Sequence, residues 1–380
     1  MPENSELFGH SANHFALKLY ARLRSQDRPN SVFSPLSIYT ALCMTQAGAR
    51  GATAEEMAAI LEVPHAWDQE HLQLAYGEFM KSLARPEAKT YFRLDIANRL
   101  WLAQGAELRE QFVQLLKTHY DSGVGSVDFR GQPEPARLEI NKWVAEKTRN
   151  QIPELFLPGT ISEQTLLVLA NAILFIGQWA RPFDPKLTRP GVFHVSAEQT
   201  AQVPMMLQRG DYHHAELKEL QLLELEYAGK SASMVILLPN QGCEVKQIEE
   251  LLTEQLDRWM ETLRATRHGS LEVELPRFRI TSRSPLVQPL KGMGLELPFS
   301  DKADFSGMCS LSHLSLSKIV HQASVEVNEE GTVATAATAT VVTRGYPPEF
   351  HVDRPFLFLI RDLRTGVILF LGRVTNPLQS

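Results

Sequence analysis

The sequence predicts an α+β fold, with helices gathered in its first part and strands in its later part. Through about residue 160, apolar side chains recur at spacings of three and four residues, which is the period of helices with one buried face. After about Thr165 the chain turns to short apolar runs rich in β-branched residues, which favour strands. No Pro-, Gly- or Ser-rich linker divides the two parts, and no long internal repeat is evident. We therefore expect one large domain over residues 1–380.

The N-terminal segment carries the clearest helical pattern. Its apolar stripe consists of Phe8, Ala12, Phe15, Ala16, Leu19 and Leu23. Related patterns predict helices over residues 54–61, 112–120 and 140–152. We expect Thr53 to cap the first of these three, because Glu56 follows it at the spacing of a capping box.

Five later segments predict strands. They are residues 166–175, 233–238, 271–275, 356–360 and 367–374. In the third segment, Leu271, Val273 and Leu275 alternate with two glutamates, which indicates one buried face and one solvated face.

The charge balance excludes several classes of partner. The chain has 38 Lys+Arg against 44 Asp+Glu, a net charge of −6, and no basic run of five or more residues. A surface dedicated to nucleic acid or to anionic lipid needs concentrated positive charge. The longest apolar stretch, residues 166–177, is too short to cross a bilayer. We expect neither a nucleic-acid partner nor membrane association.

Cysteine usage and the first residues bear on the compartment. Cys43, Cys243 and Cys309 are far apart and odd in number, so we expect no disulfide framework. Residues 1–10 have neither the basic start nor the apolar run of a signal peptide, and no Asn has a Ser or Thr two places later. We expect a cytoplasmic protein, or the mature form of a secreted protein whose leader is absent.

The common catalytic signatures do not occur in the sequence. It has no G-x-S-x-G, H-E-x-x-H, P-loop or G-x-G-x-x-G motif. His213, His214 and Glu216 invite a metal-site interpretation, but adjacent residues on a strand point to opposite faces. We therefore expect no catalytic residues, no metal and no cofactor, and we do not expect an enzyme.

Residues 331–343 do not fit an ordinary strand. They read GTVATAATATVVT, without charge, proline or large side chains, and would span roughly 43 Å at about 3.3 Å per residue. A plain internal strand is one alternative, although core strands usually have about five or six residues and larger side chains. Small side chains at alternate positions suit a strand that slides between two strands already packed, because they do not overpack the core. These positions are Thr332, Ala334, Ala336, Thr338, Thr340 and Val342.

Motifs spread from end to end indicate a family. In order they are NSVFSPLSI at 30–38, GARGAT at 48–53, NAILF at 171–175 with Gly177 and Trp179, FDP at 183–185, LPRF at 275–278, LKGMG at 290–294, ADFSG at 303–307, EEGT at 329–332, DRPF at 353–356 and FLGRV at 370–374. In this order and spacing the chain resembles the serpins, serine-protease inhibitors that insert a reactive loop into their main sheet.

The resemblance implies the serpin fold: a five-stranded main sheet, two further sheets and eight or nine helices, with a reactive-centre loop displayed at one end. Residues 329–354 would form the hinge and this loop. The hinge residues would be Glu329, Glu330, Gly331, Thr332, Ala334 and Ala336. Leu174, Ile176 and Val333 depart from the family's usual residues, but none of them adds a charge, a proline or bulk that would block insertion.

A bait bond follows from the same resemblance, because the target protease supplies the catalytic Ser and His. Counting from Gly331 by the commonest family length ends at Gly345, whereas counting back from Pro347 ends at Arg344. We choose Arg344–Gly345, since Arg would ion-pair with the carboxylate of a trypsin-like specificity pocket. The expected partner is a trypsin-like serine protease, held in a covalent acyl complex by a monomeric, metastable inhibitor.

Two internal clusters are also implied. The family's shutter, a polar cluster under the middle of the main sheet, would consist of Ser34, Ser37, Asn171 and His321. Buried polar groups need partners, so such a cluster can exchange hydrogen bonds as strands separate.

The second cluster is the breach, where the loop first enters the sheet. It would contain Trp179, with the hinge acid Glu329 paired to Arg277 on the neighbouring strand. We expect this ion pair to be exposed, worth at most about 1 kcal/mol, so that its role is geometric.

A non-inhibitory serpin, acting as a carrier or chaperone, is the alternative function. Its usual sign is a hinge with charge, proline or bulk, which residues 331–343 lack.

Overall fold

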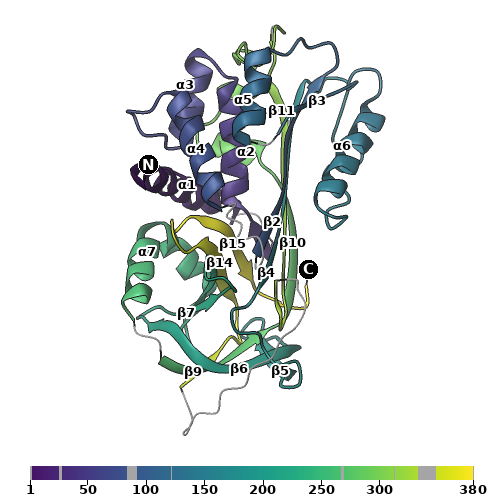
Figure 1. Cartoon of the computed structure of the whole chain (residues 1–380). Coiled ribbons are helices and arrows are strands. Elements are labelled where there is room, and N and C mark those ends of the chain that lie inside the picture. Colours follow the sequence, from purple (N-terminus) through teal and green to yellow (C-terminus); the bar gives the residue numbers. More distant parts are fainter. Residues whose placement is uncertain are drawn as a thin grey trace.

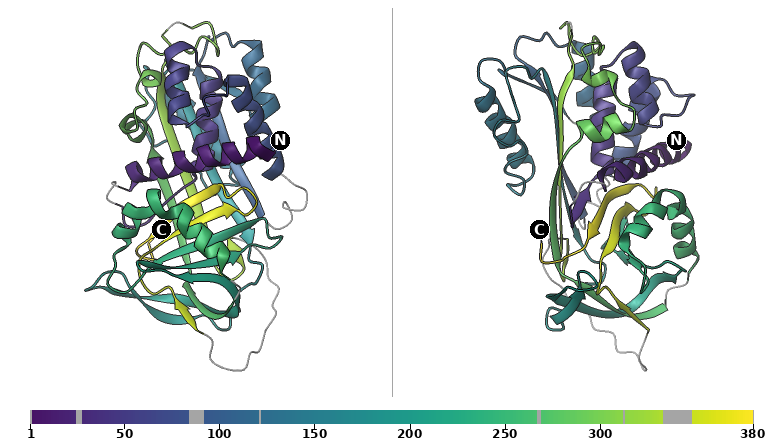
Figure 2. Two further views of the ribbon diagram at one scale, coloured as in Figure 1. Left: turned by 90° about the vertical axis from the view of Figure 1, so that its left-hand side faces the viewer. Right: turned by 180° about the vertical axis from the view of Figure 1, so that it is seen from behind.

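One long sheet runs the length of the molecule and joins a helical region to a second region of strands (Figure 1). The structure is a computed structural model, which describes residues 2–24, 28–83, 92–120, 122–266, 269–311, 313–332 and 348–379. Most helices pack at one end of the long sheet, and the second sheet lies at the other end with one helix against it (Figures 1 and 2). The predicted α+β class is confirmed.

Eight α-helices lie within the described residues. They are α1 (Pro2–Leu23), α2 (Pro35–Ala47), α3 (Gly51–Ile60), α4 (Gln69–Leu83), α5 (Glu110–Tyr120), α6 (Pro133–Lys147), α7 (Val245–Ala265) and α8 (Val287–Gly292). The predicted N-terminal stripe is confirmed, since Phe8, Phe15 and Leu19 are fully buried. Every residue of α2 is buried, because the helix packs on α1, α4 and the main sheet. A helix covered all round has no need of a polar face.

The main sheet has the five strands expected, and their order is β10-β11-β4-β2-β3. Their bounds are β10 (Phe278–Pro285), β11 (Leu316–Val327), β4 (Leu167–Gln178), β2 (Phe92–Ala103) and β3 (Val124–Val127). The central pair, β4 and β11, runs parallel, whereas β2 and β10 are antiparallel to their inner neighbours. A two-residue strand, β12 (Gly331–Thr332), pairs with the end of β4.

The two further sheets share one strand and form a continuous hydrogen-bonded path. The order is β1-β15-β14-β8-β7-β6-β9-β13, with β5 also on β6. The bounds are β1 (Ser31–Phe33), β15 (Ile368–Val374), β14 (Phe356–Asp362), β8 (Ala232–Pro239), β7 (Leu220–Glu226), β6 (Thr200–Glu216), β9 (Gly269–Pro276), β13 (Glu349–His351) and β5 (Arg189–His194). The first part of the long β6 pairs with β5 and β9, and its last part pairs with β7. β6 therefore joins the two sheets.

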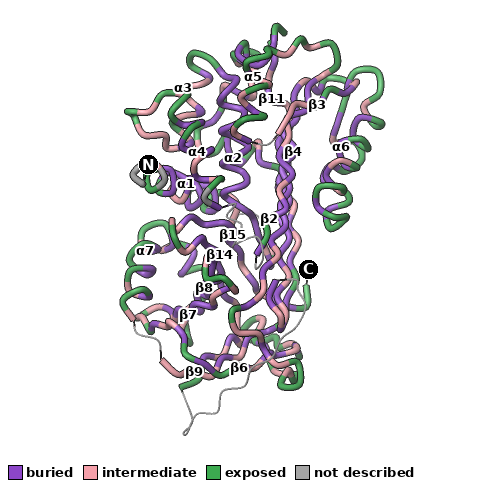
Figure 3. Tube along the Cα trace, in the orientation of Figure 1, coloured by how far each residue is buried: buried purple, intermediate pink, exposed green. Residues whose placement is uncertain are grey.

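β4 is buried on both faces. Leu167, Leu169 and Ile173 belong to the large core under α1 and α2, whereas Ala170 and Ala172 belong to a smaller core under α6. Strands covered on both sides read as continuous apolar runs, as this one does. Figure 3 shows buried residues concentrated along the sheet and α2, and exposed residues on the outer sides of α3, α6 and α7.

The predicted start of α3 is wrong. The helix begins at Gly51, so Thr53 lies inside it, where its hydroxyl accepts a hydrogen bond from the Asp304 N–H at 2.9 Å. Glu56 likewise binds outside its own helix, accepting from the Leu297 N–H at 2.9 Å. Both side chains fit the capping pattern, but tertiary contacts use them instead.

The predicted bounds of α6 are also wrong, because the helix spans Pro133–Lys147 rather than residues 140–152. Proline is favourable in the first turn of a helix, where its missing N–H costs nothing. The helix ends before Arg149 and Asn150, which adopt φ angles of 52° and 60°.

The sequence pattern does not predict β2 at all. This twelve-residue strand carries two buried polar residues, Asp95 and Asn98, which break the apolar alternation expected of a strand. Asp95 is compensated by ion pairs with Arg93 at 2.5 Å and Arg149 at 3.3 Å. Asn98 joins the polar cluster described below.

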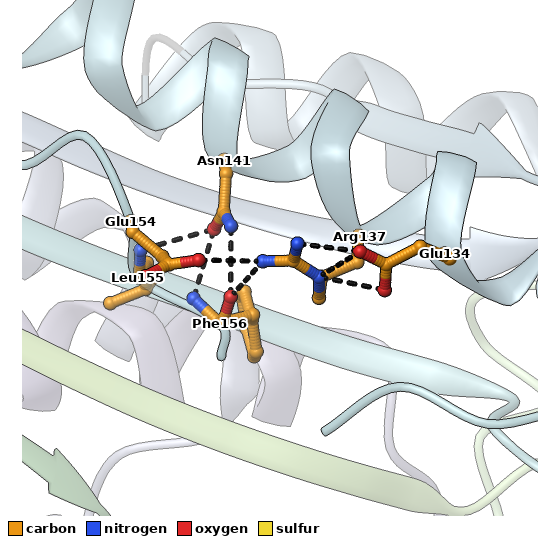
Figure 4. Close-up of polar contacts among 6 residues, drawn as sticks. All are labelled: Glu134, Arg137, Asn141, Glu154, Leu155 and Phe156. Carbon is orange, nitrogen blue, oxygen red and sulfur yellow. Dashed lines mark hydrogen bonds and ion pairs between the residues drawn. The ribbon is translucent and has the colours of Figure 1, made fainter. Parts of the chain in front are cut away.

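One buried arginine holds α6 over the main sheet (Figure 4). Arg137 donates through Nη1 to the Phe156 carbonyl at 2.6 Å and the Glu154 carboxylate at 3.0 Å, and through Nε to Glu134 at 2.9 Å. Asn141, one turn later, donates to the same Phe156 carbonyl at 2.8 Å. These bonds, which we call the α6 clamp, tie the helix to the segment that returns the chain to β4.

We expect Arg137→Ala to lower the free energy of unfolding by about 2 kcal/mol, because buried hydrogen bonds from a charged donor are lost. Chemical denaturation measures the change. Lys142→Ala, on the exposed side of the same helix, is the control and should change stability by less than about 0.5 kcal/mol. Equal effects of the two substitutions would contradict the structural role of the α6 clamp.

Candidate functional site

Polar side chains from three neighbouring strands meet under the middle of the main sheet. In the strand register Asn98 on β2 lies opposite Asn171 on β4, which lies opposite His321 on β11. Ser34 and Ser37, at the start of α2, cover this row from one side. All five residues are buried. The structure therefore brings together the four residues predicted for the shutter, and adds Asn98.

A continuous hydrogen-bond network links these residues. The Ser34 N–H donates to His321 Nε2 at 3.0 Å, so the ring proton sits on Nδ1, which donates to Asn171 Oδ1. Asn171 Nδ2 donates to both the carbonyl and the hydroxyl oxygen of Ser37, each at 2.9 Å. The Ser37 hydroxyl donates to Asn98 Oδ1 at 3.2 Å. The network thus satisfies polar groups that burial would otherwise leave unpaired.

The imidazole of His321 is neutral in the folded protein. Burial lowers its pKa from 6.5 to about 3, because the charged form would lose its hydration. A neutral ring is also what the network requires, since Nε2 accepts a hydrogen bond.

β4 and β11 stop pairing before the end of the sheet. Their register ends at Leu174 and Ser324. Beyond that point β4 pairs antiparallel with β12, which places Thr332 opposite Gly177, and β12 also lies beside β11. The place where the two strands part is therefore already occupied by Gly331 and Thr332.

Gly331 occupies a position that only glycine fits. Its φ of +147° lies in a region that side chains disfavour, and a Cβ there would come 2.0 Å from the Gly177 carbonyl oxygen.

An aromatic pair, Tyr227 and Trp179, packs at the start of β12. Thr332 is fully buried, and its hydroxyl lies 3.1 Å from the Tyr227 hydroxyl. The Tyr227 ring stacks on Trp179 with centroids 4.6 Å apart. Trp179 donates through Nε1 to the Asn328 carbonyl and through its backbone N–H to the Glu330 carbonyl, each at 3.0 Å. The residues on both sides of the turn into β12 are thus bound to Trp179.

Glu329 and Arg277 are brought together as expected, but the expected exposure is wrong. The Glu329 side chain is only 6% exposed, whereas that of Arg277 is 44% exposed. The carboxylate accepts from Arg277 Nε at 2.7 Å and from the Thr188 hydroxyl. Burial alone would raise the pKa of this carboxyl, but the hydrogen bonds from Arg277 and Thr188 outweigh it and lower the pKa below its ordinary value. A buried, doubly bound carboxylate is a structural anchor rather than a surface ion pair.

Four predicted residues, Ala334, Ala336, Arg344 and Gly345, lie outside the described residues. The chain is described again from Pro348, and β13 pairs in parallel with β9. The two ends of the segment 333–347 are therefore anchored to different sheets, through β12 and β13.

Three residues of these clusters are not predicted from the sequence: Asn98, Thr188 and Tyr227. Asn98 has a weak signal, being an amide within an apolar run. Thr188 and Tyr227 have none, because each reaches the hinge from a distant part of the chain.

His213, His214 and Glu216 do not form a metal site. Within the described residues, no three His, Cys, Asp or Glu side chains lie close enough together to hold an ion. His213 Nδ1 lies 2.9 Å from the Thr266 carbonyl oxygen. The three cysteines are free thiols. No described helix is both long enough and apolar enough to cross a bilayer.

We expect wild-type protein to lose stability faster than His321→Gln as the pH falls from 6.5 toward about 3. Between these pH values His321 is protonated in the unfolded chain but stays neutral in the folded protein. The free energy of unfolding therefore falls by about 1.4 kcal/mol for each unit by which the pH falls. Above pH 6.5 this loss of stability is absent, because the imidazole is neutral in both states. Denaturant midpoints between neutral pH and about pH 4 measure the difference. His65→Gln, at an exposed histidine, should keep the wild-type profile. Parallel profiles for His321→Gln and wild type would contradict a buried neutral imidazole.

Comparison with known proteins identifies the fold and the family. The family described as Serpin (serine protease inhibitor) matches residues 10–377. A leukocyte elastase inhibitor from Bos taurus is 38% identical over 379 residues, covering 96% of this chain and 97% of that protein.

Solved structures agree. Serpin48 from the insect Tenebrio molitor is similar with a TM-score of 0.86 and 32% identity, over 97% of this chain and 98% of that one. Human thyroxine-binding globulin is similar with a TM-score of 0.88 and 30% identity, over 99% of this chain and 100% of that one. One of these relatives is named as an inhibitor of a protease, and another is named as a protein that binds thyroxine. The chain therefore belongs to the serpin family, whose members are inhibitors or carriers rather than enzymes.

Proposed function

We propose that this protein is a suicide-substrate inhibitor of trypsin-like serine proteases, with Arg344–Gly345 as the bait bond. Residues 329–354 act as hinge and reactive loop of one serpin domain covering residues 1–380. The observation that carries the proposal is the seating of β12, because Gly331 and Thr332 already form the first two residues of a new strand on β4.

The direction of β12 favours insertion between β4 and β11. Those two strands are parallel to each other, and β12 is antiparallel to β4. A chain that continues from Thr332 in the same direction runs down between them and is antiparallel to both. Antiparallel pairing satisfies the backbone groups of the entering strand on each side.

The length of the segment fits the length of the strand that receives it. Continuing the register of Thr332 with Gly177 places Val342 opposite Leu167, the first residue of β4. The charge-free residues 331–342 therefore match all twelve residues of β4. The small residues at alternate positions fall opposite Phe175, Ile173 and Leu169, which belong to the large core.

The same register places Thr338 opposite Asn171, in the row of the shutter. In the inserted state a threonine hydroxyl would stand between Asn171 and His321 and can donate to one and accept from the other. The bond between Asn171 and His321 would then be exchanged for two new bonds rather than lost. This supports a sheet built to open and to close again around a strand.

At the bait bond the chemistry belongs to the protease. Its serine Oγ attacks the carbonyl carbon of Arg344 and loses its proton to the protease histidine. The bond from that carbon to the Gly345 nitrogen breaks, the amine leaves with the proton, and an ester to the serine stays. Insertion of residues 333–342 then carries the attached protease away before water hydrolyses the ester.

Mixing the protein with trypsin should give a covalent complex that survives boiling in detergent, seen by gel electrophoresis. Arg344→Ala should abolish the complex, because the side chain that enters the specificity pocket is gone. The released C-terminal peptide should begin at Gly345, as mass spectrometry shows. A start at Tyr346 would move the bond by one residue. Plain digestion with full protease activity retained would refute the inhibitor and favour the carrier or chaperone alternative.

A matched pair of substitutions tests insertion. In the inserted register Ala334 would face the buried Phe175, whereas Val333 would fall opposite Ile176, which is only partly buried. Ala334→Glu should therefore stall insertion, because burying an unpaired carboxylate costs several kcal/mol. Val333→Glu should trap trypsin as wild type does. Thr332 is unsuitable for this test, since it is buried before insertion begins.

The readout is the fraction of inhibitor trapped against the fraction cleaved and released. Cleavage should also raise the melting temperature of the wild type and of Val333→Glu, but not that of Ala334→Glu. Trapping by Ala334→Glu at the wild-type ratio would show that the register, or the role of insertion, is wrong.

A further inference from the structure

Two histidines lie one turn apart on the solvent side of α1, the helix that crosses the molecule between its helical end and the second sheet (Figure 2). Phe8 and Phe15 face the core and are fully buried, whereas His10 is exposed and the side chain of His14 is 44% exposed. Residues four apart on a helix are neighbours on one face. The two imidazole rings are nearly parallel, with an angle of 12° between their planes and 6.0 Å between their centres.

This spacing is the one at which a helix presents two imidazoles to one metal ion. In the H-E-x-x-H motif, two histidines four residues apart bind zinc from one helix face. Residues 10–14 read HSANH, which keeps the histidine spacing and lacks the catalytic glutamate. Imidazole nitrogen binds zinc at about 2.0–2.1 Å and is also a good ligand for copper and nickel. Because both side chains reach solvent, rotation about their side-chain bonds can bring the two rings onto one ion.

Glu62 fixes the orientation of one of these rings. It follows α3 with a φ of 54°, and its carbonyl accepts a hydrogen bond from the Ser11 hydroxyl at 2.7 Å, which docks this turn on α1. Its carboxylate Oε2 lies 3.3 Å from His14 Nδ1, and its other oxygen pairs with Lys18.

The contact with Glu62 leaves the other nitrogen of His14 available. A proton on Nδ1 faces the carboxylate, so Nε2 keeps the lone pair that a metal ion requires. A carboxylate behind a histidine is a common partner of metal-binding imidazoles, because it selects the tautomer and makes the ring a stronger ligand.

We propose that His10 and His14 together bind one divalent transition-metal ion of the class that prefers imidazole, such as Ni²⁺, Cu²⁺ or Zn²⁺. Glu62 supports His14 from behind and does not bind the ion. The site thus has two protein ligands, in keeping with the absence of any closed group of three among the described residues, and water completes the coordination. The sequence-based expectation of no metal would then be wrong for this surface.

Metal binding at this site would stabilise the folded protein. The helix holds the two rings next to each other, whereas the unfolded chain sets no fixed distance between them. A ligand that binds the folded state more tightly than the unfolded state raises the melting temperature in proportion to its occupancy. This inference does not depend on the proposed inhibitor function.

Isothermal titration calorimetry of the whole protein with NiCl₂ tests the site. Wild type should bind Ni²⁺ at least about tenfold more tightly than His10→Gln or His14→Gln, because each substitution removes one of two ligands. The matched control, His71→Gln combined with His194→Gln, removes two exposed histidines elsewhere and should bind as wild type does. No binding by wild type, or an unchanged affinity in either His10→Gln or His14→Gln, would overturn the site.

Thermal unfolding gives an independent readout and checks that the variants fold. Without metal, His10→Gln should melt as wild type does, since the side chain is exposed. Added NiCl₂ should raise the melting temperature of wild type and of the His71/His194 control, but not that of His10→Gln. An equal rise in His10→Gln would place the metal elsewhere and refute the proposal.

The role of Glu62 is tested by Glu62→Gln, which should weaken Ni²⁺ binding by about tenfold. Lys18→Gln is its matched control, because it removes the other partner of Glu62 and leaves the contact with His14. We expect Lys18→Gln to bind Ni²⁺ at least as tightly as wild type. Wild-type affinity in Glu62→Gln would contradict the support assigned to this carboxylate.

Discussion

The pairing of β4 with β11 is the interaction on which the rest of this molecule depends. It lies in the middle of the main sheet with both faces covered, yet it is the joint that has to part if a strand enters. Apolar packing alone would not favour one register over another for a strand that enters between β4 and β11. The hydrogen bond between His321 and Asn171 is directional, and its groups accept a new partner only in a matching register. Under the proposed mechanism, the polar row would therefore set the register in which β4 and β11 separate and pair again.

Contacts of a different kind fix the turn before β12, at the end of the sheet where β4 and β11 stop pairing. Trp179 binds two carbonyls of the turn before β12, and the buried Glu329 carboxylate is fixed by Arg277 and Thr188. These contacts determine the register in which β12 starts, because Thr332 can only meet Gly177 if the turn before it is fixed. An entering strand would inherit that register along its whole length. A slip of one residue would turn every small side chain away from the core.

Much of this arrangement is accessible from the sequence, and the failures have physical causes. Short motifs predict the family, and the family resemblance implies the five-stranded sheet and the four shutter residues that the structure brings together. Thr53 and Glu56 fit a capping box that tertiary contacts override. β2 is missed because its buried Asp95 and Asn98 pair with Arg149 and Ser37 on other segments, which no local pattern reveals. The exposure expected for Glu329 is wrong for the same reason, because Thr188 and the surrounding burial come from elsewhere in the chain.

Under the proposed mechanism, the insertion of residues 333–342 is delayed by a barrier rather than by a balance of contacts. An inserted strand would add backbone hydrogen bonds to both β4 and β11, so under this mechanism the closed sheet would not be the lowest state available to the chain. The shutter connects β4 and β11 to α2 on one face of the sheet. On the other face, the α6 clamp holds α6 over the sheet by tying it to the segment that returns the chain to β4. Each alone is a modest interaction of exchangeable hydrogen bonds. Because a strand can enter only when both faces yield together, their costs add in the transition state, whereas after insertion the bonds can form again with new partners.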